Sequence, residues 1–177
     1  MLKFCVLASS SSGNCALVAT PQTRLLIDAG LSAKETYARL EAIGENPCDI
    51  DAILITHEHS DHVCGLPALA RKLSKDKNQP VPVYLTKLTA PMIDWNSTTG
   101  PPEVIEFQAG TRFRIGDIEV TSFTIPHDAV DPIGFTFIGV EPRWASRRTW
   151  AMCPIRSRCI WKTLTSCSSK AITTSTC

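Results

Sequence analysis

The sequence predicts a layered domain of mixed α/β (α+β) class. Two observations carry this prediction: short apolar runs rich in β-favouring residues recur along residues 1–138, and segments with helical periodicity are inserted between them. With 177 residues, 44% of them hydrophobic, the chain is long enough for one domain with an apolar core. We therefore expect strands and helices packed in layers around that core.

The first fifty residues predict a β-meander followed by a helix. Turn-rich residues separate three β-type runs, which cover residues 2–8, 15–20 and 24–28. Ser32 then fits a helix N-cap with Glu35 three positions later, and Gly44 ends the helical pattern after Ile43.

The segment up to residue 138 predicts strands around a second helix. Residues 50–56 form a buried-type strand, and a helical pattern covers residues 66–73 before a turn at 74–79. Gly116 and Asp117 fit a hairpin turn. The later strands are expected at residues 81–86, 104–107, 111–115, 118–125 and 135–138.

Composition places the protein in the cytoplasm, away from membranes. No run approaches the roughly 18 apolar residues of a membrane helix, and residues 4–8 are too few for a secretory signal core. The eight cysteines include no Cys-x-x-Cys pair, and a chain of this size does not depend on disulfides. We expect a cytoplasmic protein with reduced thiols and no membrane partner, while the sequence leaves its oligomeric state open.

A dense cluster of metal-binding residue types follows the strand at 50–56. Residues 56–62 read Thr-His-Glu-His-Ser-Asp-His, an arrangement that chance produces in about one of ten thousand chains of this composition. Alternate residues of an extended segment point the same way, so His57 and His59 can reach one metal ion, whereas Asp61 and His62 lie beyond the turn. Imidazole and carboxylate ligands favour one or two Zn²⁺ ions, although Mn²⁺ or iron accept a related set. The alternative is a solvated polar loop.

This cluster, placed after an apolar strand, resembles the signature of the metallo-β-lactamase superfamily, whose members are mostly hydrolases with one or two zinc ions. Asp28 ends an apolar strand where that superfamily carries an aspartate of the second ligand shell, and His127 follows the strand at 118–125 as its third ligand to the first metal would. Alone, Asp28 would be an ordinary turn carboxylate and His127 a structural or exposed histidine. Within the superfamily, residues 9–14, 56–62 and 127–129 resemble the nuclease-like bacterial YycJ/WalJ group.

The resemblance implies a fold and a set of ligands. The fold would be the N-terminal part of the four-layer αβ/βα metallo-β-lactamase sandwich. The first metal ion would be held by His57, His59 and His127. The second would be held by Asp61 and His62, and Asp61 would also act catalytically by orienting the metal-bound water or accepting its proton.

These ligands predict a hydrolase that uses a metal-activated water. Zinc with three protein ligands lowers the pKa of its bound water from 15.7 to about 7, which makes hydroxide available at neutral pH. We expect phosphodiester hydrolysis with DNA as the candidate substrate. The alternatives are a thioester or lactone hydrolase of the same fold, and a non-catalytic fragment that binds at most one metal. Glu58 and Ser60 are expected to point away from the metals, toward solvent or backbone partners.

Charge gives the DNA prediction little support. A nuclease should present a basic groove, yet residues 1–138 contain eleven Lys and Arg against sixteen Asp and Glu. The densest basic run there favours a solvated helix end over a DNA contact, and consists of Arg71, Lys72, Lys75 and Lys77.

Residues 139–177 have a different character. They contain seven Lys and Arg against Glu141 alone, half of the cysteines and three of the four tryptophans. Neither strand alternation nor a helical stripe is convincing, so we expect a disordered tail; a basic nucleic-acid-binding arm is the alternative. No histidine follows His127, and the superfamily's bridging aspartate motif is also missing.

A reading-frame shift near residues 139–143 would explain this tail. Starting each codon on the third base of the printed one, the genetic code permits Thr-Asp-Leu-Gly with its aspartate codon spanning Arg148 and Thr149. The same frame permits Asn-His-Asp with its histidine codon spanning Ile172 and Thr173. We therefore interpret residues 1–138 as an incomplete metallo-β-lactamase domain and residues 139–177 as an out-of-frame tail.

Overall fold

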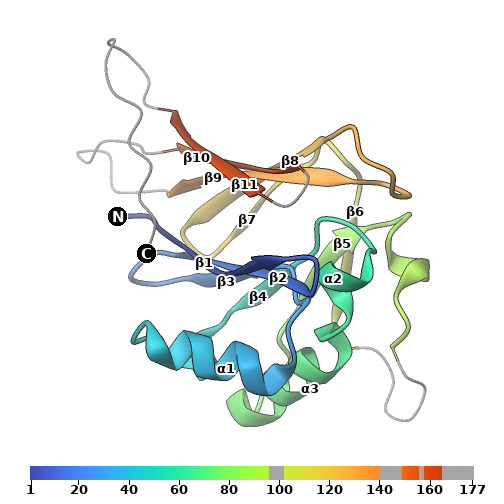
Figure 1. The fold of residues 1–177 in the computed structure, drawn as a ribbon. Coiled ribbons are helices and arrows are strands. Elements are labelled where there is room, and N and C mark those ends of the chain that lie inside the picture. The colour runs from blue at the N-terminus through green and yellow to red at the C-terminus, as the bar shows by residue number, and fades with distance from the viewer. Residues whose placement is uncertain (96–101, 140–148, 156–157, 165–177) are drawn as a thin grey trace.

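Two β-sheets and three α-helices make up the computed structural model, which describes residues 1–95, 102–139, 149–155 and 158–164 (Figure 1). The helices lie against one face of the first sheet, and the second sheet lies across its other face. Among the described residues, no helix is both long and apolar enough to cross a membrane.

The first sheet has six strands that follow one another in sequence order. They are β1 (Lys3–Ser10), β2 (Gly13–Ala19), β3 (Arg24–Ile27), β4 (Ala52–Leu54), β5 (Val83–Thr86) and β6 (Val104–Phe107). The first three pair antiparallel, which confirms the predicted meander, and the later ones pair parallel. Parallel neighbours need crossover connections, and the helices and loops between β3 and β6 supply them.

The helices begin at the predicted residues, but one runs longer than expected. Helix α1 (Ala33–Ala42) starts after Ser32, whose hydroxyl accepts a 3.2 Å hydrogen bond from the backbone N–H of Glu35. Helix α3 (Leu66–Lys77) continues through the turn predicted at 74–79. Lys72 and Asp76 pair one turn apart at 2.9 Å, and Asn78, in the left-handed conformation, ends the helix instead. Short helices complete the set: η1 (Pro47–Asp49), α2 (Ser60–Val63) and η2 (Ala90–Met92).

The second sheet is antiparallel, in the order β11-β10-β9-β8-β7. Its strands are β7 (Arg112–Ile115), β8 (Ile118–Thr124), β9 (Ile133–Gly139), β10 (Thr149–Ile155) and β11 (Arg158–Leu164). The predicted hairpin turn between β7 and β8 is confirmed, with Gly116 at φ 54°. Strands β10 and β11 were not predicted. Strand β10 extends the edge of β9 through backbone pairing, which no residue pattern in the tail signals. The rest of residues 139–177 lies outside the described residues, so disorder there stays a prediction.

Two apolar cores hold the layers together. Successive residues of a strand point to opposite faces, so Leu26 packs toward the helices, whereas Leu25 and Ile27 pack between the two sheets. Leu40 of α1 and Leu69 of α3 are fully buried on the helix side. The mixed α+β class is therefore confirmed. The layer of helices and the two sheets correspond to three layers of the expected sandwich.

Candidate metal centre

The predicted site residues gather at the carboxyl ends of two parallel strands. Asp28 follows β3 directly, and Thr56 and His57 follow the end of β4 by two and three residues. The backbone N–H of Asp28 donates to the carbonyl of Leu54 at 2.8 Å, which extends the pairing of β3 with β4 into the site. The loops that leave these strands therefore begin side by side.

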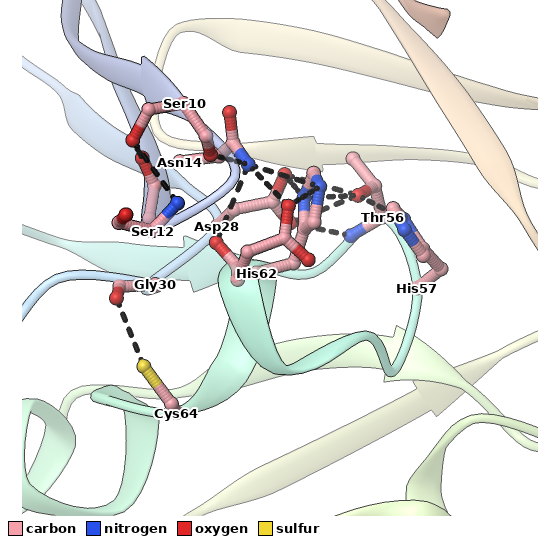
Figure 2. A network of polar contacts seen from close by, with 11 residues as sticks. Ser10, Ser12, Asn14, Asp28, Gly30, Thr56, His57, His62 and Cys64 are labelled. Carbon is pink, nitrogen blue, oxygen red and sulfur yellow. Dashed lines mark hydrogen bonds and ion pairs between the residues drawn. The ribbon is translucent and has the colours of Figure 1, made fainter. Parts of the chain in front are cut away.

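Asp28 connects two of the loops that carry predicted ligands. Its carboxylate is fully buried, and its backbone φ of 61° turns the chain sharply away from β3. Oδ1 accepts hydrogen bonds from the Thr56 backbone N–H at 2.9 Å and from the Thr56 hydroxyl at 3.0 Å. Oδ2 lies 2.7 Å from Nδ1 of His62 (Figure 2). Asp28 thus contacts one predicted ligand and the residue that precedes another.

The Thr56 hydroxyl determines which nitrogen of His57 carries the proton. Because the single hydroxyl proton is donated to Asp28, Thr56 Oγ1 accepts at 2.9 Å from Nδ1–H of His57. Nε2 of His57 therefore keeps its lone pair, and this buried atom has no hydrogen-bond partner among the described residues. A buried, unpartnered imidazole nitrogen costs free energy unless it has a ligand, so it suits a metal ion.

Three histidines from two distant loops form a group that could hold a metal ion. The candidate ligand atoms of His57, His59 and His127 all lie within 4.8 Å of one another. The ring of His127 lies 4.8 Å from that of His57 and 5.0 Å from that of His59, between centroids. His57 is buried, His59 is half-buried and His127 is exposed, so the group opens toward solvent. These are the three residues predicted for a first metal ion.

Asp61 and His62 lie together beside this group, on α2. Oδ2 of Asp61 is 3.5 Å from Nε2 of His62, and the ring centroid of His62 is 4.0 Å from that of His57. The side-chain N–H₂ of Asn14 donates to Asp61 Oδ2 at 2.8 Å and lies 3.2 Å from His62 Nε2. The structure thus brings all five predicted ligands into one region. His57 belongs to the three-histidine group and also lies next to His62.

Electrostatics differ sharply between the two buried histidines. Burial and the neighbouring His62 lower the pKa of His57 to about 4, so His57 is neutral at pH 7. Burial also lowers the pKa of His62, but the charge of Asp28 and its hydrogen bond outweigh this effect, and the pKa of His62 is raised overall. A neutral imidazole is the form that binds metal, and His57 meets this condition without a change of pH.

Close backbone packing fixes the ligand helix against the loop after β3. A Cβ on Gly30 would lie 1.8 Å from the carbonyl oxygen of Asp61, so only glycine fits there. The backbone N–H of Ala29 donates to the His62 carbonyl at 2.7 Å, and Cys64 Sγ lies 2.9 Å from the Gly30 carbonyl (Figure 2). These contacts place α2 relative to Asp28.

Glu58 has a backbone partner, one of the two kinds of partner predicted for it. Its Oε1 accepts a 2.8 Å hydrogen bond from the N–H of Val130 in the β8–β9 loop. The same loop is tied at its end by the N–H of Ile133, which donates to the Thr56 carbonyl at 3.1 Å. Oε2 of Glu58 is buried and has no partner among the described residues.

Two residues of the network were missed by sequence reasoning. Asn14 was noted only as part of the turn-rich segment at 9–14, and Thr56 only as the residue before the first histidine. Asn14 directly precedes the β-type run at 15–20 and Thr56 ends the run at 50–56. A short polar residue at such a position is a weak signal that many turns share. Their contacts with Asp28 and Asp61 arise from the tertiary fold.

The surroundings contribute negative rather than positive charge. A cleft of about 310 Å³ beside the ligand loop contains two carboxylates and no basic side chain; it is lined by Glu58, Ser60, Val63, Cys64, Pro67, Met92, Ile93 and Asp94. In the basic run of α3, Lys72 pairs with Asp76 at 2.9 Å and Lys77 with Asp51 at 3.0 Å. These pairs favour the interpretation of that run as a solvated helix end.

Known proteins share both a family model and substantial sequence identity with this chain. The sequence model of the metallo-beta-lactamase superfamily matches residues 10–141. The chain is 40% identical over 139 residues to exodeoxyribonuclease WalJ of Streptococcus pneumoniae, covering 77% of this chain and 49% of that protein. It is 41% identical over 142 residues to exodeoxyribonuclease YycJ of Bacillus anthracis, covering 77% of this chain and 50% of that protein.

Solved structures show the same fold at lower identity. A B3 metallo-beta-lactamase with an active-site glutamic acid aligns with a TM-score of 0.59 and 20% identity, over 81% of this chain and 57% of that one. The metallo-beta-lactamase SMB-1 bound to mercaptoacetic acid aligns with a TM-score of 0.58 and 21% identity, over 81% and 58%. The chain spans about half the length of the curated relatives it matches.

Proposed function

Because this chain belongs to the metallo-β-lactamase superfamily, we propose that it is part of a metal-dependent hydrolase that cleaves DNA phosphodiesters. One observation carries the metal-dependent part: the ligand atoms of His57, His59 and His127 lie within 4.8 Å of one another. The DNA part rests on the 40–41% identity to two exodeoxyribonucleases. Fold alone does not select a substrate, so that identity carries the substrate class.

The three-histidine group would hold the first metal ion. A set of three imidazoles suits Zn²⁺, and Mn²⁺ or iron would accept a related set. The lone pair that Thr56 leaves on His57 Nε2, and the lowered pKa of His57, both prepare this nitrogen for a cation. Asp61 and His62 would hold a second ion.

A metal ion such as zinc, when bound by these residues, would supply activation of the attacking water at neutral pH. The protein's own residues orient the partners of that reaction. Asp61, fixed by Asn14 at 2.8 Å, is the group we assign to orient the water or accept its proton. Asp28 acts through others, because it fixes the His62 ring by an Nδ1 hydrogen bond and positions Thr56 by two more.

The second metal position has fewer ligands than the first. Only Asp61 and His62 are available there among the described residues, and the sequence contains no histidine after His127. We therefore expect one tightly bound ion and weak hydrolysis by this chain. A non-catalytic fragment that binds one metal is the second candidate, and this ligand shortage is the observation that favours it.

One finding supports the frameshift hypothesis for residues 139–177. The superfamily match ends at residue 141, within the range proposed for the shift. Sequencing the encoding DNA from the codon of Pro132 onward tests it. Asp and His codons at 148–149 and 172–173 in one open frame would support the hypothesis, and their absence would make the tail genuine.

We also propose a cytoplasmic location. The four cysteines whose side chains the structure describes form no disulfide. Reduced thiols of this kind are typical of a reducing compartment. Redox-state labelling of these thiols in intact cells would test this. Predominantly oxidised cysteines would contradict a cytoplasmic location.

The function is tested by hydrolysis of bis(p-nitrophenyl) phosphate and of linear DNA, with a thioester as the competing substrate. We expect weak phosphodiester hydrolysis that EDTA and His57→Ala abolish. Thioester cleavage without phosphodiester cleavage would favour the other hydrolase class. One bound zinc without turnover of any substrate would favour the non-catalytic fragment, and the absence of bound metal would contradict the proposal as a whole.

A further inference from the structure

The third histidine of the group lies on the least protected part of the site. His57 and His59 follow the buried strand β4 within five residues, whereas His127 is exposed in the loop between β8 and β9. Val130 in the same loop is 48% exposed. Ordering an exposed loop costs conformational entropy, so a metal site that depends on it gains affinity if the loop is already fixed.

Glu58 supplies such a fixation. It lies between two of the histidines in sequence, yet its Oε1 accepts from the N–H of Val130 at 2.8 Å, across 72 positions of the chain. Within the loop, the N–H of Ala129 donates to the His127 carbonyl at 3.0 Å. A tight turn thus connects His127 to the residue that Glu58 holds.

The other oxygen of Glu58 has no competing partner. Oε2 is buried without a hydrogen-bond partner among the described residues. The bond from the Val130 N–H is therefore the hydrogen bond that fixes the Glu58 carboxylate within the part of the chain that the structure describes.

We propose that Glu58 is a positioning residue of the metal centre. It holds the β8–β9 loop through Val130 so that His127 meets His57 and His59 before the metal arrives. This inference rests on the proposed three-histidine site and adds a residue that fixes the geometry of that site without binding the metal.

The test is Zn²⁺ affinity, measured by competition with a chromogenic chelator, together with the visible absorption spectrum of the Co²⁺-loaded protein. Glu58→Ala removes one hydrogen bond to a charged acceptor, and we expect it to weaken binding roughly tenfold. Glu58→Gln keeps the acceptor oxygen and should stay within about threefold of the wild type. Glu41→Ala removes an exposed carboxylate from α1 and is the matched control, expected to leave affinity and spectrum unchanged.

A second variant guards against misfolding of Glu58→Ala. Val130→Pro removes the donor N–H and leaves Glu58 in place, so it should weaken Zn²⁺ binding to a similar degree. In the double variant the two losses should not add, since both remove the same hydrogen bond.

The outcomes separate this inference from the function on which it rests. Wild-type protein without bound Zn²⁺ overturns the proposed metal site. Wild-type protein that binds Zn²⁺, with Glu58→Ala binding equally well, overturns the role of Glu58 alone. Equal losses in Glu58→Ala and Glu58→Gln would also overturn the hydrogen-bond clamp, because the glutamine retains the acceptor.

Discussion

Replacing Asp28 with alanine should destabilise the folded chain strongly. The substitution removes the acceptor for the Thr56 backbone N–H and for His62 Nδ1, both of them buried, while the Thr56 hydroxyl can rotate to another acceptor. Each buried donor left without a partner costs about 1–3 kcal/mol, so the pair costs about 2–6 kcal/mol. For a chain of this size, even the lower bound of about 2 kcal/mol corresponds to a fall of about 4–8 °C in Tm.

Urea unfolding of the metal-free proteins measures this loss, with Asp28→Asn as the matched variant. Asparagine tolerates the φ of 61° and keeps an acceptor oxygen for Thr56, so its loss should be about half that of alanine. Its N–H₂ group would face His62 Nδ1 and move the proton of that ring to Nε2, the nitrogen that lies 3.5 Å from Asp61 Oδ2. An unfolding free energy of Asp28→Ala within about 1 kcal/mol of the wild type would refute this reasoning.

Three further perturbations have defined outcomes. Gly30→Ala should lower Tm and weaken metal binding, because the added Cβ would lie 1.8 Å from the Asp61 carbonyl oxygen. Thermal melts with and without Zn²⁺ measure both effects, and an unchanged Tm in both melts would contradict this expectation. The hydrogen bond from Arg24 lowers the pKa of Glu45, so the stability that this pair contributes is present above the ordinary value of 4.5 and is lost as pH falls below it. Urea unfolding between pH 3 and pH 7 should show that loss, and Glu45→Gln should remove that part of the pH dependence. Zn²⁺ at about 100 times its Kd should raise the unfolding free energy by about 2.7 kcal/mol, and the same stabilisation in His57→Ala would contradict the ligand assignment.

The sequence predicts most elements of the fold because their signals are local. The Ser32 cap, the hairpin at Gly116 and the alternating burial of Leu25 and Leu26 depend on residues within a few positions of one another. The end of α3 was placed too early, because Ser74 to Lys77 resemble a turn in composition. Their helical state depends on the Lys72–Asp76 pair and on the Asn78 stop.

The candidate site likewise combines features with local sequence signals and features that depend on contacts between distant segments. The cluster at 56–62 is dense enough to predict a metal site by itself. His127 was predicted only through the family resemblance, and the structure brings it beside the cluster from 65 residues further along the chain. The roles of Asn14 and Glu58 could not be read from the sequence, because each depends on a hydrogen bond to a distant segment, at 47 and 72 positions. Backbone pairing of β10 with β9 was missed for the same reason.

The central claim is that His57, His59 and His127 bind one metal ion, and zinc K-edge X-ray absorption of the Zn²⁺-loaded chain tests it most directly. We expect a stoichiometry of one, with three imidazole nitrogens and one oxygen donor at about 2.0–2.1 Å. The spectrum of His127→Ala should show two imidazole nitrogens around the zinc in place of three. A spectrum dominated by sulfur at about 2.3 Å, or a protein that retains no zinc after dialysis, would contradict the account.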